Sequence, residues 1–397
     1  MDSMKLGIEE NHAAGGARAQ ETGPPKAAYI HVPFCAHRCG YCNFTVISGR
    51  DDLVNAYLDA IEVELSGLGE PRPVETIFFG GGTPTQLPPD GLERLLETVA
   101  RWFPLSPGGE NTVEANPADL KQDDLARLAA HGVTRISLGA QSLDAGKLGI
   151  LERDHRGNDV RRAVELGRRY VTSVSLDLIY AVPGETLEAW TRDLAAAIAL
   201  EPNHFSIYGL TYERGARFWS RRRRGELKTV DEATEAAMYE AALDQLTRAG
   251  FEHYEISNFA RTGHRCRHNE TYWTGQEYYA AGPGAARYVS GTRSVNHRST
   301  TTYLNRVLAG RSPIAESETL LPEDRARETL VFGLRRLEGV DGEAFIRQTG
   351  YRIEDLAGKP VSRFVELGLL ERRETRLRLT RRGLLVSDSM WPHFLRR

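Results

Sequence analysis

The chain has 397 residues, which is enough for one large domain and a smaller one. Its composition is that of a soluble globular protein, with 41% hydrophobic and 26% charged residues. The formal net charge of −3 gives no basic footprint, so we expect no nucleic-acid partner, and the lack of a long apolar run excludes a membrane span.

Residues 1–26 are rich in Gly, Ala, Glu and Pro without a hydrophobic period, and we predict a disordered lead-in. Early acidic residues and the lack of an apolar core exclude a signal peptide here. Three of the four cysteines fall in one short motif, which predicts a reducing compartment and hence a cytoplasmic protein. Peripheral membrane contact stays open.

From Ala27 onward, short apolar runs alternate with amphipathic stretches, a pattern typical of βα units in a parallel sheet. The predicted strands cover residues 27–32, 74–79, 111–115, 133–139, 172–180 and 204–210. The predicted helices cover residues 51–68, 90–103, 119–130, 158–168 and 186–200. Six units are too many for a dinucleotide-binding half and too few for a closed eight-stranded barrel, so we predict an open, partial (β/α)6 barrel.

The helix over 90–103 has the clearest period. Asp90 is its expected N-cap. Its apolar residues share one face, namely Leu92, Leu95, Leu96, Val99, Trp102 and Phe103.

Cys35, Cys39 and Cys42 follow the first strand with the spacing C-x3-C-x2-C. A disulfide leaves one of the three unpaired, and structural zinc needs four ligands. A cubane iron–sulfur cluster fits better, because three thiolates hold three of its irons and leave the fourth open for chemistry.

The turn GGGTPT, at residues 80–85, follows the second strand, and we expect its backbone N–H groups to come close to a ligand. Polar residues also stand at the ends of later strands. Together they offer acceptors for an ammonium and a ribose, and a cation for a carboxylate: Glu114, Gln141, Arg153 and Asp177. Each of them alone is equally well read as an ordinary strand-end or surface residue.

Four arginines at 221–224 follow the sixth strand. We interpret them as a solvated turn or helix end in preference to an anion site. A helix over 231–249 and a strand over 251–257 come next, and we expect them to cover the edge of the sheet.

The segment HNETYW places His268 and Asn269 close to Tyr272 and Trp273. An imidazole beside two large aromatic side chains suits a flat macrocycle with an iron to ligate. Cys266 lies two residues before the histidine. Two ligands are too few for a second metal site, so we interpret Cys266 as a free buried cysteine.

Near the C-terminus, predicted helices over 322–335, 341–349 and 354–368 precede a hairpin over 368–383. This is a winged-helix-like pattern, which we read as a structural lid in preference to a DNA reader. The predicted divisions are the lead-in at 1–26, the barrel at 27–225, an extension carrying HNxxYW at 226–317 and the winged-helix-like domain at 318–397.

Taken together, these motifs resemble those of the oxygen-independent coproporphyrinogen III oxidases of the radical S-adenosylmethionine (SAM) superfamily and, more closely, the related HemW heme chaperones. The resemblance covers roughly residues 27–390. It rests on YIHVPFC with C-x3-C-x2-C-x-F, GGGTPT, EANP, SLGAQS, DLIYxxPG, YEISNFA and HNxxYW.

The resemblance implies a radical SAM barrel in which Cys35, Cys39 and Cys42 hold a [4Fe-4S] cluster with SAM on the open iron. The positions matching contacts to that SAM are Tyr29, Gly81 and Glu114. The positions matching contacts to a second SAM are Tyr41, Gly82, Thr83, Gln141, Arg153 and Asp177. His268, Asn269, Tyr272 and Trp273 are then the heme-binding residues.

Two departures separate the chain from the oxidases. The oxidases carry a further cysteine two residues beyond the third, where this chain has Phe44. The oxidases also have a long ordered N-terminal extension. Both departures match HemW. The chain departs from HemW at Ala286, where that family commonly has histidine. We therefore expect a heme chaperone that delivers heme to apo-hemoproteins and draws on an electron donor, with a radical SAM enzyme acting on a porphyrinogen as the alternative.

Overall fold

The computed structural model describes residues 23–396. The predicted disordered lead-in falls almost wholly outside this range. No helix of the described residues is long and apolar enough to cross a bilayer.

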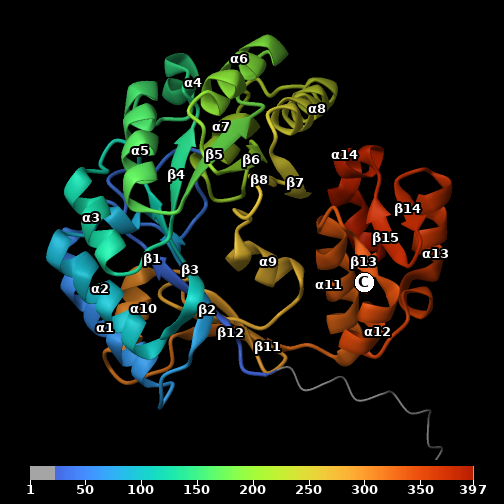
Figure 1. Ribbon diagram of the computed structural model, residues 1–397. Coiled ribbons are helices and arrows are strands. Elements are labelled where there is room, and N and C mark those ends of the chain that lie inside the picture. Colours follow the sequence, from blue (N-terminus) through green and yellow to red (C-terminus); the bar gives the residue numbers. More distant parts are fainter. Residues whose placement is uncertain (1–22, 397) are drawn as a thin grey trace, which may run out of the picture.

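A parallel sheet forms the centre of the larger domain (Figure 1). Its six strands pair in chain order, each parallel to the next. They are β1 (Ala27–Val32), β2 (Val74–Gly81), β3 (Leu105–Ala115), β4 (Arg135–Gln141), β5 (Ser173–Tyr180) and β6 (His204–Gly209). The predicted α/β fold is confirmed, with each strand at or within a few residues of its expected place except β3, which begins six residues earlier.

Helices follow the strands and cover the outer face of the sheet, as in Figure 1. The predicted ones are α1 (Val54–Ser66), α2 (Pro89–Trp102), α3 (Gln122–Ala130), α5 (Gly157–Tyr170) and α6 (Leu187–Ile198). The short α4 (Ala145–Ile150) was not predicted; the Asp144 side chain caps it by accepting from the Lys147 backbone N–H.

Helix α2 buries the predicted apolar face, including Leu92, Leu95, Leu96 and Val99. Its start differs from the prediction. Asp90 lies inside the first turn and is not the N-cap, because Pro89 occupies the first helical position, where the fixed φ of proline suits a helix and its missing N–H costs nothing.

Three short strands extend the sheet to nine. The predicted strand over 251–257 is two pieces, β7 (Glu252–Glu255) and β8 (Asn258–Ala260), and β8 pairs antiparallel with β6. Together with α8 (Glu232–Arg248) they cover that edge, as predicted. At the other edge β9 (Tyr279–Ala281) pairs parallel with β1, which the sequence did not reveal.

The extension contains α7 (Arg217–Arg223), α9 (Arg267–Trp273), α10 (Thr300–Val307) and a second sheet of β10 (Ala286–Val289), β11 (Thr292–Asn296) and β12 (Ile314–Thr319). Glu64 of α1 anchors it to the barrel. This partly buried carboxylate accepts from Tyr303 Oη at 2.7 Å, Asn296 Nδ2 at 2.7 Å and the Gly282 N–H at 2.9 Å.

The C-terminal domain has the predicted three helices and hairpin, set to one side of the barrel in Figure 1. Its elements are α11 (Pro322–Arg335), β13 (Val340–Asp341), α12 (Gly342–Thr349), α13 (Ile353–Glu366), β14 (Leu370–Arg373), β15 (Arg376–Leu379) and α14 (Arg381–Met390). Two hairpin arginines pair with acidic neighbours, Arg372 with Glu354 and Arg378 with Glu371, so part of the hairpin's positive charge is already neutralised.

Candidate cluster and cofactor site

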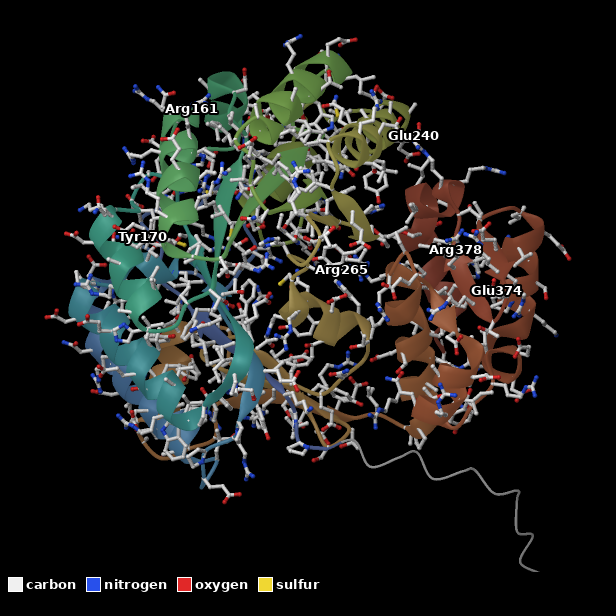
Figure 2. The ribbon with its side chains drawn as sticks, in the orientation of Figure 1. Arg161, Tyr170, Glu240, Arg265, Glu374 and Arg378 are labelled. Atoms are coloured by element: carbon white, nitrogen blue, oxygen red, sulfur yellow. The ribbon has the colours of Figure 1, made fainter. Side chains whose placement is uncertain are left out.

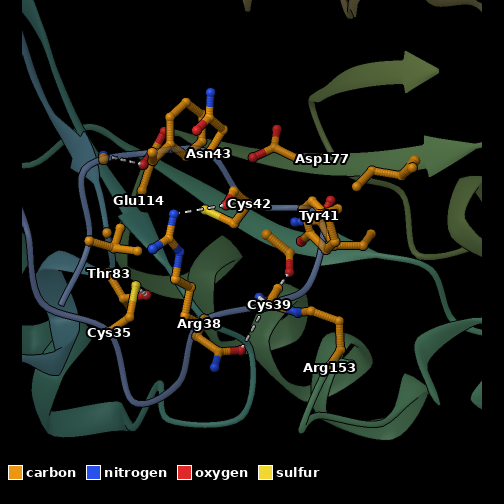
Figure 3. Close-up of a pocket in the computed structure, with 18 of the residues that line it drawn as sticks. Cys35, Arg38, Cys39, Tyr41, Cys42, Asn43, Thr83, Glu114, Arg153 and Asp177 are labelled. Atoms are coloured by element: carbon orange, nitrogen blue, oxygen red, sulfur yellow. Dashed lines mark hydrogen bonds between the residues drawn. The ribbon is translucent and has the colours of Figure 1, made fainter. Parts of the chain in front are cut away.

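The cysteine loop leaves the carboxyl end of β1 and is closed on itself by backbone hydrogen bonds. The Cys35 N–H donates to Ile47 O at 3.0 Å, and the Cys42 N–H donates to Cys39 O at 3.2 Å. None of the three cysteines is in a disulfide. Figure 3 shows the three side chains around one hollow.

The glycine turn after β2 supports the base of that loop. Gly81 N–H donates to Glu114 Oε2 at 2.9 Å, Gly82 N–H to Val32 O at 2.8 Å and Thr83 N–H to Phe34 O at 2.7 Å. The sequence suggested that these N–H groups face a ligand. Instead the chain itself uses them, and the glycines allow a close approach of β2 to β1.

Gly82 shows why a side chain is excluded there. A Cβ on this residue would lie 2.6 Å from Phe34 O and 2.7 Å from Val32 O, both of them backbone atoms. Gly81 has a φ of +103°, and a Cβ there would meet the ring of His31. The turn therefore requires glycine at both positions.

Helix α7 holds the far side of the cysteine loop. Phe218 N–H donates to Gly40 O at 2.9 Å, and Arg217 donates to Arg38 O at 2.8 Å and to Glu152. The run at 221–224 begins at the end of this helix, and its later members are exposed. This matches the interpretation of the run as a helix end.

A cavity of about 700 Å³ opens at the carboxyl ends of the strands. All three motif cysteines line it. So do eight of the nine predicted SAM residues: Tyr41, Gly81, Gly82, Thr83, Glu114, Gln141, Arg153 and Asp177. The ninth, Tyr29, lines a neighbouring cavity, and its hydroxyl is 3.1 Å from His31 Nδ1.

The thiols fit a metal cluster by their chemistry. Burial raises the pKa of Cys35 to about 11 and also raises the pKa of Cys42, so both are neutral thiols until a metal displaces their protons. Among residues 23–396, no three His, Cys, Asp or Glu side chains converge as ligands of a single metal ion. A cubane does not need that, since it takes one thiolate per iron at separate corners.

Two partly buried carboxylates line the cavity. Burial, followed by the charge of Asp177, raises the pKa of Glu114 to about 8, against the opposing hydrogen bond from Gly81. Burial also raises the pKa of Asp177 to about 6, although serine hydroxyls oppose the shift; Ser137 Oγ donates at 3.1 Å. Such desolvated acids gain from a cationic ligand.

Arg153 supplies the opposite charge. Its Nη2 donates to Gly139 O at 2.9 Å and to Asn116 Oδ1 at 3.2 Å, and its Nη1 lies 3.5 Å from Cys39 Sγ. Its Nε is buried and has no partner among the described residues. The cavity therefore offers acids for an ammonium and a guanidinium for a carboxylate, as a SAM molecule needs.

The pKa of Glu114 gives a test in the protein without SAM. The pKa of Glu114 is higher in the folded protein than in the unfolded chain. The contribution of its neutral form to the free energy of unfolding is therefore fully present below pH 4.5 and is lost as the pH rises through 8. Over this range Glu114 should lower the free energy of unfolding of the wild type by up to ~1.4 kcal/mol per pH unit, and we expect Glu114→Gln to remove this slope. Urea unfolding from pH 4.5 to 8.5 measures it. An unchanged slope in the variant means that other groups, Asp177 first, carry the pH dependence.

The predicted heme residues do not share one cavity. His268, Asn269 and Tyr272 line a cavity of about 200 Å³, which also meets Tyr29 and Glu114. Trp273 instead lines a third cavity, and Tyr272 lies between the two.

His268 is 1% exposed and both of its ring nitrogens are engaged. Nδ1 is 2.9 Å from Thr76 Oγ1, and Nε2 is 2.8 Å from Tyr272 Oη. Burial lowers the pKa of His268 to about 3, so the imidazole is neutral at physiological pH. The ring is in the form that ligates iron, but it must first give up a hydrogen bond.

Cys266 is free and buried, as predicted, with its Sγ 3.6 Å from Glu110 Oε1. Glu110 in turn pairs with the buried Arg135 at 3.2 Å. In Figure 2, Arg265 is drawn beside this region, between the barrel and the C-terminal domain.

Sequence reasoning missed several residues that line the large cavity, among them Asn116, Asp154 and Arg298. The sequence could have indicated Asn116 as a site residue, because it lies two residues after Glu114 in the EANP segment. Arg298 had none: it comes from far along the chain and donates to Asn43 O at 2.5 Å.

Comparison with known proteins identifies the family. The radical SAM superfamily matches residues 29–196, and the HemN C-terminal domain matches residues 320–386. The heme chaperone HemW of Bacillus subtilis is 34% identical over 376 residues, which are 93% of this chain and 99% of that protein. The chain belongs to the HemW family. The expected resemblance is thereby confirmed.

The chain is also similar to other proteins with a radical SAM domain. HemW of Mycobacterium tuberculosis H37Rv is 35% identical across 93% of this chain and 94% of its own. The mitochondrial radical S-adenosyl methionine domain-containing protein 1 of Bos taurus is 34% identical across 96% and 90%. Among solved structures, the coproporphyrinogen III oxidase HemN of Escherichia coli superposes with a TM-score of 0.83 at 22% identity, covering 94% and 90%; at that identity it shows the shared fold. Membership of the radical SAM superfamily implies a [4Fe-4S] cluster and SAM.

Proposed function

We propose that this chain is a heme chaperone that binds heme and delivers it to apo-hemoproteins while carrying a [4Fe-4S] cluster and SAM. The likeness to HemW proteins over nearly the full length of both chains carries the proposal. One departure from the oxidases supports it. Phe44 stands where the oxidases have their further cysteine, and its side chain is 66% exposed beside the cavity.

In this proposal Cys35, Cys39 and Cys42 hold the cluster through their thiolates. Bound there, the cluster would supply one-electron reduction to SAM, and an electron donor would feed it. The chain's own groups orient the ligand. Glu114 accepts from a cationic or hydroxyl group, and the unpartnered Nε of Arg153 pairs with a carboxylate.

The remaining assignments follow the matched positions. Tyr29, Gly81 and Glu114 belong to the first SAM; a second SAM takes Tyr41, Gly82, Thr83, Gln141, Arg153 and Asp177. The large cavity, at about 700 Å³, falls well within the range of small-molecule sites of about 300–1,000 Å³. Tyr29 does not line the large cavity but lines the neighbouring one, which shares Glu114, so in this proposal it meets SAM from that side.

The second candidate is a radical SAM enzyme that acts on a porphyrinogen, and the fold shared with the E. coli oxidase favours it. One experiment separates the two. Cluster-loaded protein is incubated anaerobically with SAM, reductant and coproporphyrinogen III, while a parallel sample is titrated with heme. We expect heme binding near one per chain and no conversion. Multiple-turnover formation of protoporphyrinogen makes the chain an oxidase.

The proposed heme residues are His268, Asn269, Tyr272 and Trp273. His268→Ala is expected to lose the absorption spectrum of histidine-ligated heme. Tyr272→Phe keeps the ring but frees Nε2, and we expect it to bind heme more tightly than the wild type. Heme titrations followed by absorbance measure both.

The control for these variants is His204→Ala, which removes another buried imidazole, 2% exposed, from the same cavity. It should keep the histidine-ligated spectrum. If His268→Ala also keeps it, His268 is not the iron ligand, although the chaperone function stands.

A further inference from the structure

A third cavity, of about 310 Å³, lies where the barrel extension meets the C-terminal domain. Helices α9 and α11 face each other there in Figure 1, and β10 and β11 close the space. Aromatic rings and two arginines form much of its wall, and we call it the aromatic cavity: Trp273, Tyr278, Tyr288, Phe332, Arg293 and Arg325.

Two polar atoms of this wall have no partner. Trp273 Nε1 and Tyr288 Oη are both buried, and neither has a hydrogen-bond partner among residues 23–396. Buried hydrogen-bond donors normally have an acceptor. Two donors without an acceptor in one cavity therefore point to a ligand or bound water that accepts from them.

Positive charge is also left over in the aromatic cavity. Arg293 is paired with Glu328 at 2.8 Å. Arg325 forms no ion pair within the described part of the chain, and its guanidinium stacks 5.7 Å from the centre of the Tyr288 ring. A guanidinium, an indole N–H and a phenol O–H together form a donor set for a carboxylate.

The wall is held in place from behind. The guanidinium of Arg335 lies 4.4 Å over the Trp273 ring, and Phe332 lies 6.3 Å from Trp273 between ring centres. Rigid aromatic faces bind flat apolar rings at little entropic cost. The space is at the lower end of the range for ligand sites, so a large flat molecule enters it by one edge.

We propose that the aromatic cavity takes one edge of the cargo tetrapyrrole, with a carboxylate arm of that edge held by Arg325, Tyr288 and Trp273. This inference rests on the proposed function. The space around His268 is smaller, about 200 Å³, and its wall includes serines, acids and Arg135 beside aromatic rings, so it leaves a charged edge of the ring to be held elsewhere.

Metal-free protoporphyrin IX is the probe, because it keeps the ring and both carboxylates but offers no iron to an axial ligand. Binding is followed by porphyrin fluorescence and by energy transfer from tryptophan. We expect Arg325→Gln to weaken binding by about tenfold, as loss of one charge-assisted contact does, and Tyr288→Phe to weaken it several-fold. Trp273→Phe should remove most of the energy transfer.

The matched control is Arg347→Gln, which removes the same charge from an exposed residue of α12 that does not line the aromatic cavity. It should bind the porphyrin as the wild type does. Protoporphyrin dimethyl ester, which lacks the charged arms, should bind the wild type and Arg325→Gln equally.

The outcomes separate the inference from the function beneath it. If the wild type binds heme but Arg325→Gln and Tyr288→Phe bind protoporphyrin within twofold of it, the aromatic cavity is not the docking site and the chaperone function survives. If the wild type binds neither heme nor protoporphyrin, the proposed function itself fails. Tyr288→Phe removes only a hydroxyl, so it remains informative if Arg325→Gln does not fold.

Discussion

Chain carrying Cys39→Ser is expected to hold almost no iron or sulfide after anaerobic reconstitution, whereas the wild type holds about four irons per chain. Cys39 is the most buried of the three motif cysteines, at 8% exposed. Its sulfur lies 3.5 Å from Nη1 of the Arg153 guanidinium. A serine oxygen in that place is a far poorer ligand for iron. Iron and sulfide assays, with the absorption spectrum, measure the loss.

The fourth cysteine provides the control. Cys266→Ala removes a buried thiol that contacts Glu110 and lies outside the cysteine loop, so cluster content should stay at the wild-type level. A Cys39→Ser protein that keeps its iron, or a Cys266→Ala protein that loses it, contradicts the assignment of the cluster to this loop.

Gly82→Ala is expected to lower the free energy of unfolding by roughly 1–3 kcal/mol or more, the usual cost of overpacking, and to reduce cluster loading sharply. The new methyl group would lie 2.6 Å from Phe34 O and 2.7 Å from Val32 O. These are backbone atoms at the start of the cysteine loop, and they move only if the loop moves. Urea unfolding and iron content measure the two effects on one preparation.

Gly91→Ala is the matched control for that variant. Gly91 lies in α2, and a Cβ there meets only side chains, at 3.5 Å or more. Alanine is the better helix former, so this variant should gain up to about 1 kcal/mol. Equal stability losses in both variants would mean that the tight packing at Gly82 is not what requires glycine.

The regular part of the fold was predictable because local pattern and tertiary packing agree. The apolar face of 90–103 is the buried face of α2. Strand β1 falls on its predicted residues. By contrast, β9 is a run of Tyr279 and two alanines whose strand state depends on pairing with β1, so no local pattern marks it.

The residue types of the site were also predictable, but their contacts were not. Motif spacing placed the cysteines, Glu114 and Arg153 in one cavity. Motif spacing could not show that the N–H groups of the glycine turn donate hydrogen bonds within the chain. Nor could it show that Thr76 and Tyr272 hydrogen-bond to the two ring nitrogens of His268. These contacts join residues as far as 192 positions apart, and only the folded chain brings them together.

The cysteine loop is held by parts of the chain that are synthesised long after it. Strand β1 and the loop are made first, yet α7, the chain near Arg298 and β9 hold them in place. A ribosome adds about 5–20 residues per second, so the nascent loop waits on the order of ten seconds or more for those partners. Iron and sulfide delivered earlier would meet an unsupported loop, so we expect metallation of this protein to come late in synthesis or after it.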